Sequence, residues 1–326
     1  MKITDKTILV TGGAGFIGSY LSEAYLNRGD EVYVIDDLST GSLDNIKHLM
    51  RNPLFHFVND TILNREAMTE LIGICDVTAH LAAAVGVKLI IDEPLKSIHT
   101  NIAGTEITLE LADKFRKKIF LASTSEIYGR NSSVPLSEND VRIYGPTSIA
   151  RWSYAASKAM DEFLALAYYR TKQLPIIIAR FFNTVGPRQT GQYGMVVPRF
   201  VRQALRNEPI TVFGDGAQTR NFTFVADVVP GIVGLIDEPK AIGETFNIGG
   251  KGEISMNDLA ARVKSITQSL SPIQHIPYNQ AYQEGFEDME RRVPDISKIE
   301  NLIGYKNHHD LDSILTKIVE FERTRV

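Results

Sequence analysis

A glycine-rich turn near the start of the chain constrains the fold more than any other stretch of the sequence. A β-branched run at residues 7–11 leads directly into the motif GGAGFIG, residues 12–18, and a helical pattern continues as far as Asn27. Glycines at this spacing keep the turn tight, bring the backbone against a pyrophosphate at the helix start, and allow close packing of helix on strand. The motif therefore predicts a dinucleotide site whose contacts are Gly12, Gly15, Phe16, Ile17 and Gly18.

The next expected strand, residues 31–36, leads into two carboxylates, Asp36 and Asp37. A carboxylate at this point suits the free 2′-hydroxyl of an adenine ribose and repels a 2′-phosphate, so we predict NAD rather than NADP as the cofactor. Ligands of such a sheet gather at the carboxyl ends of its strands. The segments that follow the strands are therefore expected to complete the cofactor site, with contacts from Ser39, Thr40, Gly41, Asp60, Leu81, Ala82 and Ala83.

Short apolar runs alternate with longer helical stretches through the first 180 residues. This alternation predicts an α/β fold with a doubly wound parallel sheet of the Rossmann type. We expect an NAD-binding domain at 1–180 and a smaller substrate-binding domain at 181–326. Segments near 221–250, FTFVADVV and FNIGG, are expected to return to the main sheet, and the chain is expected to end in two helices near 295–303 and 311–324. The expected strands of the main sheet are 7–11, 31–36, 55–58, 76–82, 118–123 and 174–180.

The composition of the 326-residue chain is that of an ordinary globular protein, with 44% hydrophobic and 23% charged residues. Its formal net charge of −4 is spread along the chain, so we expect neither a nucleic acid nor a membrane as partner. The N-terminal apolar run is too short for a signal peptide, and we expect a cytoplasmic protein. A single cysteine, Cys75, and seven scattered histidines predict neither a disulfide nor a metal site.

The stretch RWSYAASK places Tyr154 and Lys158 one helical turn apart on the same face. Such a spacing can arise by chance, but the stretch STSEIYG follows an expected strand and is expected to lie against this helix. Beside Lys158 and a positive nicotinamide, Tyr154 would favour its phenolate, which requires roughly 4 kcal/mol of stabilisation. The phenolate would then take a hydroxyl proton while a hydride passes from the same carbon to NAD, with Thr124 or Ser125 orienting the hydroxyl.

Four motifs, GGAGFIG, STSEIYG, YAASK and ARFFNTVGPR, resemble in sequence and separation the extended short-chain dehydrogenases/reductases of the nucleotide-sugar epimerase/dehydratase family. The resemblance covers nearly the whole chain. It implies that Tyr154 and Lys158 act on a sugar 4-hydroxyl with help from Thr124, and that the substrate is a nucleotide sugar, in first place a UDP-sugar. It also implies a homodimer, in which the long helices expected at 94–117 and 154–172 pair across the interface.

The pyrophosphate of a nucleotide sugar needs cations placed locally, because the chain as a whole is acidic. Arginine suits this role, since its guanidinium binds phosphate oxygens in a bidentate geometry, and Arg188, Arg220 and Arg292 are the candidates. The family resemblance assigns phosphate contacts to Asn183, Arg220 and Arg292. It assigns the contact with the base to the segment ITVFG, which contains Val212.

Oxidation of the sugar at C4 opens three reactions. A carboxylate on C5 gives a β-keto acid that loses carbon dioxide, a hydroxyl at C6 allows dehydration, and turnover of the ketosugar in its pocket gives 4-epimerisation. The Thr-Ser-Glu sequence ending at Glu126 resembles UDP-glucuronate decarboxylases and GDP-mannose dehydratases, whereas similar 4-epimerases usually carry a small residue there. The Arg151-Trp152 pair and the segment GFEDMERRVPDISK also resemble decarboxylases, in which the residues matching Glu126 and Arg292 belong to the active site.

Other features keep alternatives open. The loop LAAAVGVKLIIDEP resembles that of some 4-epimerases, and its Lys88 either faces a sugar carboxylate or is solvated. Glu126 could also cap the following turn or pair with Arg151. We predict a UDP-glucuronate decarboxylase, with a UDP-sugar 4-epimerase acting on UDP-glucose or UDP-glucuronate and a nucleotide-sugar 4,6-dehydratase as alternatives. A non-catalytic NAD-binding sensor is disfavoured because the chain keeps the Tyr-Lys pair.

Overall fold

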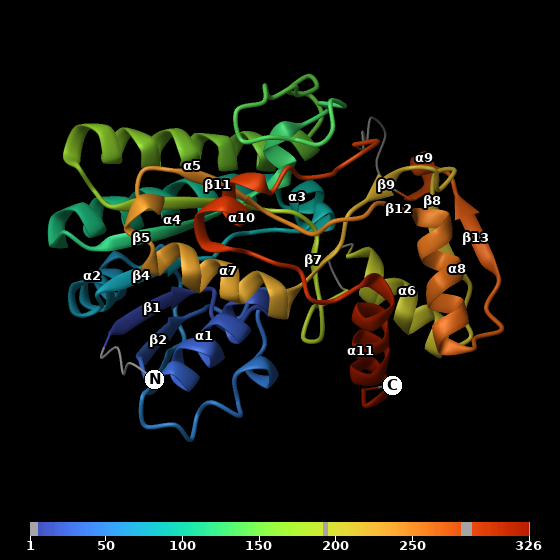
Figure 1. Cartoon of the computed structure of the whole chain (residues 1–326), viewed down its shortest axis with the longest axis horizontal. Helices are drawn as coiled ribbons and strands as arrows, with labels where there is room; N and C mark the ends of the chain where they lie inside the picture. Colours follow the sequence, from blue (N-terminus) through green and yellow to red (C-terminus); the bar gives the residue numbers. More distant parts are fainter. Residues whose placement is uncertain (1–5, 192–194, 282–288, 326) are drawn as a thin grey trace.

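A seven-stranded sheet forms the centre of the computed structural model, which describes residues 6–191, 195–281 and 289–325. Its strand order is β11-β6-β5-β4-β1-β2-β3, and every neighbouring pair is parallel (Figure 1). The chain order reverses between β1 and β4, which is the switch point of a doubly wound sheet. The strands are β1 (Thr7–Thr11), β2 (Glu31–Ile35), β3 (Phe55–Val58), β4 (Val77–His80), β5 (Lys118–Thr124), β6 (Ile176–Phe181) and β11 (Thr245–Ile248).

Helices cover both faces of this sheet, because successive residues of a strand point to opposite sides. On β1, the side chains of Ile8 and Val10 pack into the same apolar cluster as α1 (Phe16–Arg28) and α7 (Val225–Asp237). Leu9 points the other way, into the cluster that contains α2 (Arg65–Ile74), α4 (Pro94–Phe115) and α5 (Arg151–Lys172). The predicted α/β Rossmann-type fold is confirmed.

A smaller group of elements lies to one side of the main sheet (Figure 1). In it, three helices pack together: α6 (Val196–Leu205), α8 (Met256–Thr267) and α11 (Leu311–Arg323). Three two-stranded sheets accompany them, formed by β8 (Ile210–Phe213) with β13 (Ile273–Ile276), by β9 (Thr219–Arg220) with β12 (Ile254–Ser255), and by β7 (Thr184–Val185) with β10 (Thr223–Phe224). Further short elements are α3 (Val87–Asp92), α9 (Tyr278–Ala281), α10 (Ser297–Ile303), and the 3₁₀ turns η1 (Leu43–Asn45), η2 (Ser125–Tyr128) and η3 (Pro239–Ala241). Within the described ranges, no helix is both long and apolar enough to cross a membrane.

Of the two segments expected to return to the main sheet, only one does. FNIGG contributes β11, which pairs with β6. FTFVADVV supplies only the two-residue strand β10 before α7 begins at Val225. Because α7 contacts both α1 and α10 and lies against the sheet, it is apolar along most of its length, including the β-branched residues at its start. A short apolar run of this kind cannot be told from a buried strand by its pattern.

A buried ion pair holds α5 against the sheet. Glu162 accepts two hydrogen bonds from Arg180 on β6, at 2.9 Å from Nε and 2.7 Å from Nη2, and one from the Ser123 hydroxyl at 2.6 Å. Both charged side chains are only 3% exposed. Burial alone would raise the pKa of Glu162, but the hydrogen bond and charge of Arg180 hold that pKa below its usual value. Since Tyr154 and Lys158 stand on the same helix, this pair sets their position relative to the end of β5.

The Glu162→Gln substitution should destabilise the protein far more than the Glu110→Gln substitution. The first leaves the Arg180 guanidinium buried without its counter-charge, a loss of about 3–5 kcal/mol. The second weakens a surface pair with Arg65, whose two side chains are about half exposed, so solvent screens the interaction and its loss costs little stability. Urea unfolding of the two variants, followed by far-ultraviolet circular dichroism, measures both losses, and equal losses would contradict the assignment.

Candidate active site

The glycine-rich turn brings β1, β4 and α1 closer together than side chains would allow. Gly12 has a φ of +69°, and a Cβ added to it would lie 2.9 Å from the backbone nitrogen of Ala82. A Cβ on Gly18 would lie 2.3 Å from the carbonyl oxygen of Gly12. The α1 helix starts after Gly15 without a side-chain cap, so its first N–H groups remain available to a ligand. This bare, tight cradle fits the pyrophosphate of a dinucleotide.

Asp36 lies directly behind this turn. Its carboxylate accepts hydrogen bonds from the main-chain N–H groups of Ala14 at 3.0 Å and Leu38 at 2.8 Å. Burial raises the pKa of Asp36, and the backbone hydrogen bonds oppose that rise. A carboxylate has about four acceptor sites, so oxygen lone pairs remain for a ribose hydroxyl. Asp37 is exposed instead and accepts a hydrogen bond from the main-chain N–H of Ser39 at 2.9 Å.

The other residues expected at the cofactor follow β2, β3 and β4 along the same edge of the sheet. The N–H groups of Leu81 and Ala82 donate to Thr11 Oγ1 at 3.2 and 3.1 Å, which joins the end of β4 to the end of β1. Asp60, after β3, accepts a hydrogen bond from the Asn64 side chain at 2.6 Å. Parallel strands end at one edge, so these segments lie along the same edge of the sheet as the glycine turn, as do Ser39, Thr40 and Gly41 after β2 and Ala83 after β4.

The hydroxyl groups of Thr124 and Tyr154 meet where the end of β5 lies against the first turn of α5. Thr124 is the last residue of β5, and its hydroxyl caps η2 by accepting a hydrogen bond from the Glu126 N–H at 3.1 Å. The same side chain forms a hydrogen bond with the buried phenol of Tyr154. Ser125 is also buried, and its hydroxyl has no hydrogen-bond partner among the described residues. The structure therefore brings Thr124 and Tyr154 into contact, and Ser125 follows Thr124 in the chain.

Lys158 lies on the same helix as Tyr154 and has a carboxylate as its own partner. Its ammonium group donates to Asp161 Oδ2 at 2.9 Å, and both side chains are buried. Burial raises the pKa of Tyr154, the carboxylates of Glu126 and Asp161 raise it further, and the Thr124 hydrogen bond and the Arg292 charge lower it. Burial and these carboxylates therefore oppose the phenolate that the sequence predicts beside Lys158 and a positive nicotinamide.

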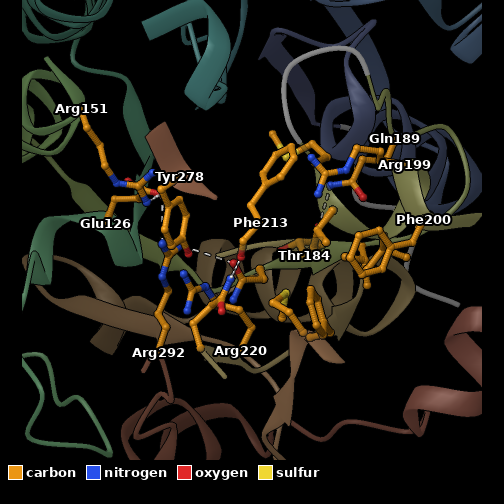
Figure 2. Close-up of a pocket in the computed structure, with 18 residues that line it drawn as sticks. Glu126, Arg151, Thr184, Gln189, Arg199, Phe200, Phe213, Arg220, Tyr278 and Arg292 are labelled. Atoms are coloured by element: carbon orange, nitrogen blue, oxygen red, sulfur yellow. Dashed lines mark hydrogen bonds and ion pairs between the residues drawn. The ribbon is translucent and has the colours of Figure 1, made fainter. Parts of the chain in front are cut away.

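Four arginines line a cleft (Figure 2) that also includes Glu126, and the charges of Glu126 and Arg292 act on Tyr154. The arginines are residues 151, 199, 220 and 292, and Glu126 is the one carboxylate among the described residues that line the cleft. This excess of positive charge in an acidic protein suits a diphosphate. The remaining lining residues are Asn183, Thr184, Val185, Gln189, Met195, Val196, Val197, Phe200, Phe213, Gln218, Phe222, Met256 and Tyr278.

Three of the five residues expected to bind the substrate line this cleft. Asn183 accepts a hydrogen bond from Arg292 Nη1 at 3.3 Å and donates to the Asn221 carbonyl oxygen at 2.9 Å. Arg220 donates to the Thr219 carbonyl oxygen at 2.7 Å, a contact that fixes the direction of its guanidinium. These contacts hold the polar groups in place before any ligand arrives.

The other two expected residues lie elsewhere. The Val212 side chain is fully buried, because alternate residues of β8 face the core, and its neighbour Phe213 lines the cleft with Arg199 3.9 Å above its ring. Arg188 is outside the set that lines the cleft and forms an ion pair at 2.8 Å with Glu23 on α1. Sequence reasoning missed Phe213 and Arg199, although the strand alternation around Val212 could have indicated the first.

Glu126 connects two arginines at the inner end of the cleft. Its Oε1 accepts hydrogen bonds from Arg292 Nη2 at 3.1 Å and Arg151 Nη2 at 3.4 Å, and Figure 2 shows both guanidinium groups converging on it. The pairing with Arg151 was one of the alternatives considered for this residue. Residues 285–288 of GFEDMERRVPDISK and the side chain of Lys88 lie outside the part that the structure describes.

The dinucleotide cradle, the Tyr154 helix and the arginine-lined cleft together define a short-chain dehydrogenase/reductase that modifies nucleotide sugars. The chain belongs to the family described as GDP-mannose 4,6 dehydratase, whose model matches residues 9–318. The family resemblance inferred from the motifs is thereby confirmed.

The relatives include both decarboxylases and epimerases. The chain is 40% identical to the UDP-N-acetyl-α-D-glucosaminuronate decarboxylase of Bacillus cytotoxicus, over 98% of each protein. It is 37% identical to UDP-glucuronic acid decarboxylase 1 of Arabidopsis thaliana, over 98% of this chain and 70% of that protein. The UDP-glucuronic acid 4-epimerase of Bacillus cereus, solved with UDP-glucuronic acid and NAD, superimposes with a TM-score of 0.89 at 31% identity, over 98% of this chain and 100% of that one. The chain is thus an enzyme of a family that uses NAD.

The Gly18→Ala substitution should weaken NAD binding about tenfold or more, which corresponds to about 1.4 kcal/mol. The added methyl would meet the Gly12 carbonyl oxygen at 2.3 Å and push the turn out of shape. Gly73→Ala is the matched control, because a methyl there would stand 3.7 Å from the Phe115 ring, at ordinary contact distance. Calorimetric titration with NAD compares the two, and unchanged affinity in Gly18→Ala would contradict the assignment of the turn.

Proposed function

We propose that this protein decarboxylates a UDP-linked uronic acid, with UDP-glucuronate as the first candidate. The observation that carries the proposal is the cluster of Arg151, Arg292 and Glu126 beside Tyr154. Two buried guanidinium groups converge on one oxygen of Glu126, and their N–H groups suit a carboxylate as hydrogen-bond acceptor. A sugar carboxylate would form charge-assisted hydrogen bonds there, which are stronger than those of the neutral group that a hexose carries at the same position.

Decarboxylation requires a ketone at C4, and Tyr154 and Thr124 are placed to form it. Bound NAD supplies the acceptor for the C4 hydride and a positive charge that favours the Tyr154 phenolate. Thr124 orients the C4 hydroxyl, and Tyr154 Oη takes its proton as the hydride leaves. The C4 ketone makes the sugar carboxylate a β-keto acid. The C5–C6 bond then breaks, carbon dioxide departs, and the electron pair forms an enolate. C5 takes a proton from solvent, which restores the C4 ketone, and the hydride then returns to C4 as Tyr154 gives its proton to the C4 oxygen.

The outer part of the cleft suits the nucleotide. Arg199 and Arg220 line it together with Asn183, and each can donate to phosphate oxygens. Phe213 lies below Arg199 and offers an aromatic face to a base. In this proposal the residues of the main sheet and its helices bind NAD, while the segments after residue 180 that line the cleft bind the UDP portion. The decarboxylase relatives, both named for UDP-linked uronic acids, support this choice of substrate.

A 4-epimerase acting on UDP-glucuronate is the second candidate. The loop LAAAVGVKLIIDEP resembles that of some 4-epimerases, and the enzyme from Bacillus cereus binds the same uronic acid on a similar fold. Both candidates share the oxidation at C4 and differ in whether the carboxylate leaves before the hydride returns.

Mass spectrometry of the products from UDP-glucuronate, UDP-N-acetylglucosaminuronate and UDP-glucose tests the proposal. With NAD present, we expect carbon dioxide and a lighter UDP-sugar from at least one uronate, and no lighter product from UDP-glucose. An unchanged mass with a shifted retention time would identify an epimerase instead. Turnover of UDP-glucose alone would overturn the role of the arginine cluster.

The Tyr154→Phe variant should lose about 10²- to 10⁴-fold of the turnover rate, as expected for removal of a general base. Its affinity for NAD and for UDP should stay unchanged, because the ring still fills its place. Tyr168→Phe, on the same helix, is the matched control and should keep full activity. Equal turnover by the two variants would show that Tyr154 is not the base.

We also propose a homodimer formed through α4 and α5. These helices pack side by side and expose large apolar side chains, with Leu95 84%, Met160 54% and Phe163 61% exposed. Met160 and Phe163 stand three residues apart and therefore share a face of α5. A second copy of the same helix pair would cover this face in a four-helix arrangement.

Light scattering at micromolar concentration should give the mass of a dimer for the natural protein. The double substitution Met160→Glu and Phe163→Glu should give a monomer, because it places charges in the proposed interface. Leu270→Glu is the control, since Leu270 is 88% exposed and lies between α8 and β13, outside the proposed interface. This substitution should leave the dimer intact. A monomer in the natural protein would contradict the proposal.

A further inference from the structure

A carboxylate lies beside Lys158 that the oxidation at C4 does not itself require. Asp161 stands one turn beyond Lys158 on α5, and its Oδ2 accepts a hydrogen bond from the lysine ammonium at 2.9 Å. The side chains of Lys158 and Asp161 are 3% and 1% exposed. A buried pair of this kind is costly to desolvate and adds little net stability, so stability alone does not account for it.

Among the residues that the structure describes, no second charged group faces the pair from β4. His80 lies there, fully buried, with Thr11 Oγ1 at 2.9 Å from Nδ1 and Thr105 Oγ1 at 3.3 Å from Nε2. Burial, and then the nearby Lys158 charge, lower the pKa of His80 to about 3, so the imidazole is neutral. Glu162, next along α5, has its charge matched by Arg180. Asp161 is therefore the group that balances Lys158.

On the other side, Tyr154 faces charges from three directions. Glu126 on η2 and Asp161 on α5 both disfavour the phenolate, while Arg292 favours it. Arg151 donates to Glu126 and belongs to the same cluster. Of the two carboxylates, Glu126 already shares its charge with two arginines, whereas Asp161 has Lys158 as its charged partner among the described groups.

We propose that Asp161 is a positioning residue for Lys158. The Asp161 carboxylate holds the lysine ammonium group beside α5 and offsets its charge. As a result, Tyr154 keeps its proton until the cofactor is bound. This inference rests on the proposed role of Tyr154 as the base. It assigns to the Lys158–Asp161 pair, rather than to Lys158 alone, control over when the phenol ionises. The lysine would act fully on Tyr154 only once a cofactor hydroxyl draws it from the carboxylate.

The test is a pH titration of the NAD-bound protein, in which tyrosinate absorbance near 295 nm is compared between each protein and its own Tyr154→Phe counterpart. The difference isolates the ionisation of Tyr154 and needs no sugar substrate. Asp161 lies two turns from Tyr154, about 10 Å along the helix. Removing its charge in Asp161→Asn should therefore move the midpoint to lower pH by about one unit.

Asp161→Glu restores the charge and should return the midpoint to that of the natural protein. Asp113→Asn, at the end of α4, removes a carboxylate far from the site and should not move it. A midpoint in Asp161→Asn that is unchanged, or shifted to higher pH, would overturn the proposal and leave Asp161 a structural partner of the lysine. Failure of the proposed function is distinguishable, because it would appear as absent turnover in the natural protein while the titration still reports on Tyr154.

Discussion

The bidentate ion pair between Arg180 and Glu162 sets the geometry of the site, because it joins the central strands to the helix that carries Tyr154. The same guanidinium also donates to the Tyr128 phenol at 2.8 Å, and that phenol donates to Asn247 on β11 at 2.7 Å. One buried cation thus touches α5, η2 and, through Tyr128, the last strand of the sheet. A polar network satisfied in this way is rigid, so Thr124, Glu126 and Tyr154 are held by the core rather than by loops.

Burial away from water then influences the pKa of Tyr154. Burial and two nearby carboxylates raise the pKa of the Tyr154 phenol, and Lys158 and Arg292 each contact one of those carboxylates. An additional positive charge in the same low-dielectric region would lower that pKa. In the proposed mechanism, proton transfer from the substrate to Tyr154 therefore depends on the binding of the dinucleotide.

The sequence predicted the fold and the use of NAD because both depend on local patterns. Glycine spacing, alternating strands and the Tyr-Lys turn can be read from neighbouring residues. FTFVADVV was expected to return to the main sheet and forms mainly α7, because its run of β-branched residues resembles a buried strand over a short window. Arg188 was expected in the cleft and instead pairs with Glu23, 165 residues away in the chain, a contact that no local pattern contains. Asp161 was visible at helical spacing from Lys158, but its effect depends on burial that only the folded chain provides.

Glu126 also determines how selective the inner cleft is toward anions. Its carboxylate is tethered to the protein at a very high effective concentration, so a free chloride or acetate ion competes poorly for the two guanidinium groups around it. An anion attached to a nucleotide that the outer arginines already bind competes better with the Glu126 carboxylate, because it is also held at a high effective concentration. For the uronate proposed as substrate, the attached nucleotide would therefore bring the carboxylate into the inner cleft in preference to small free anions.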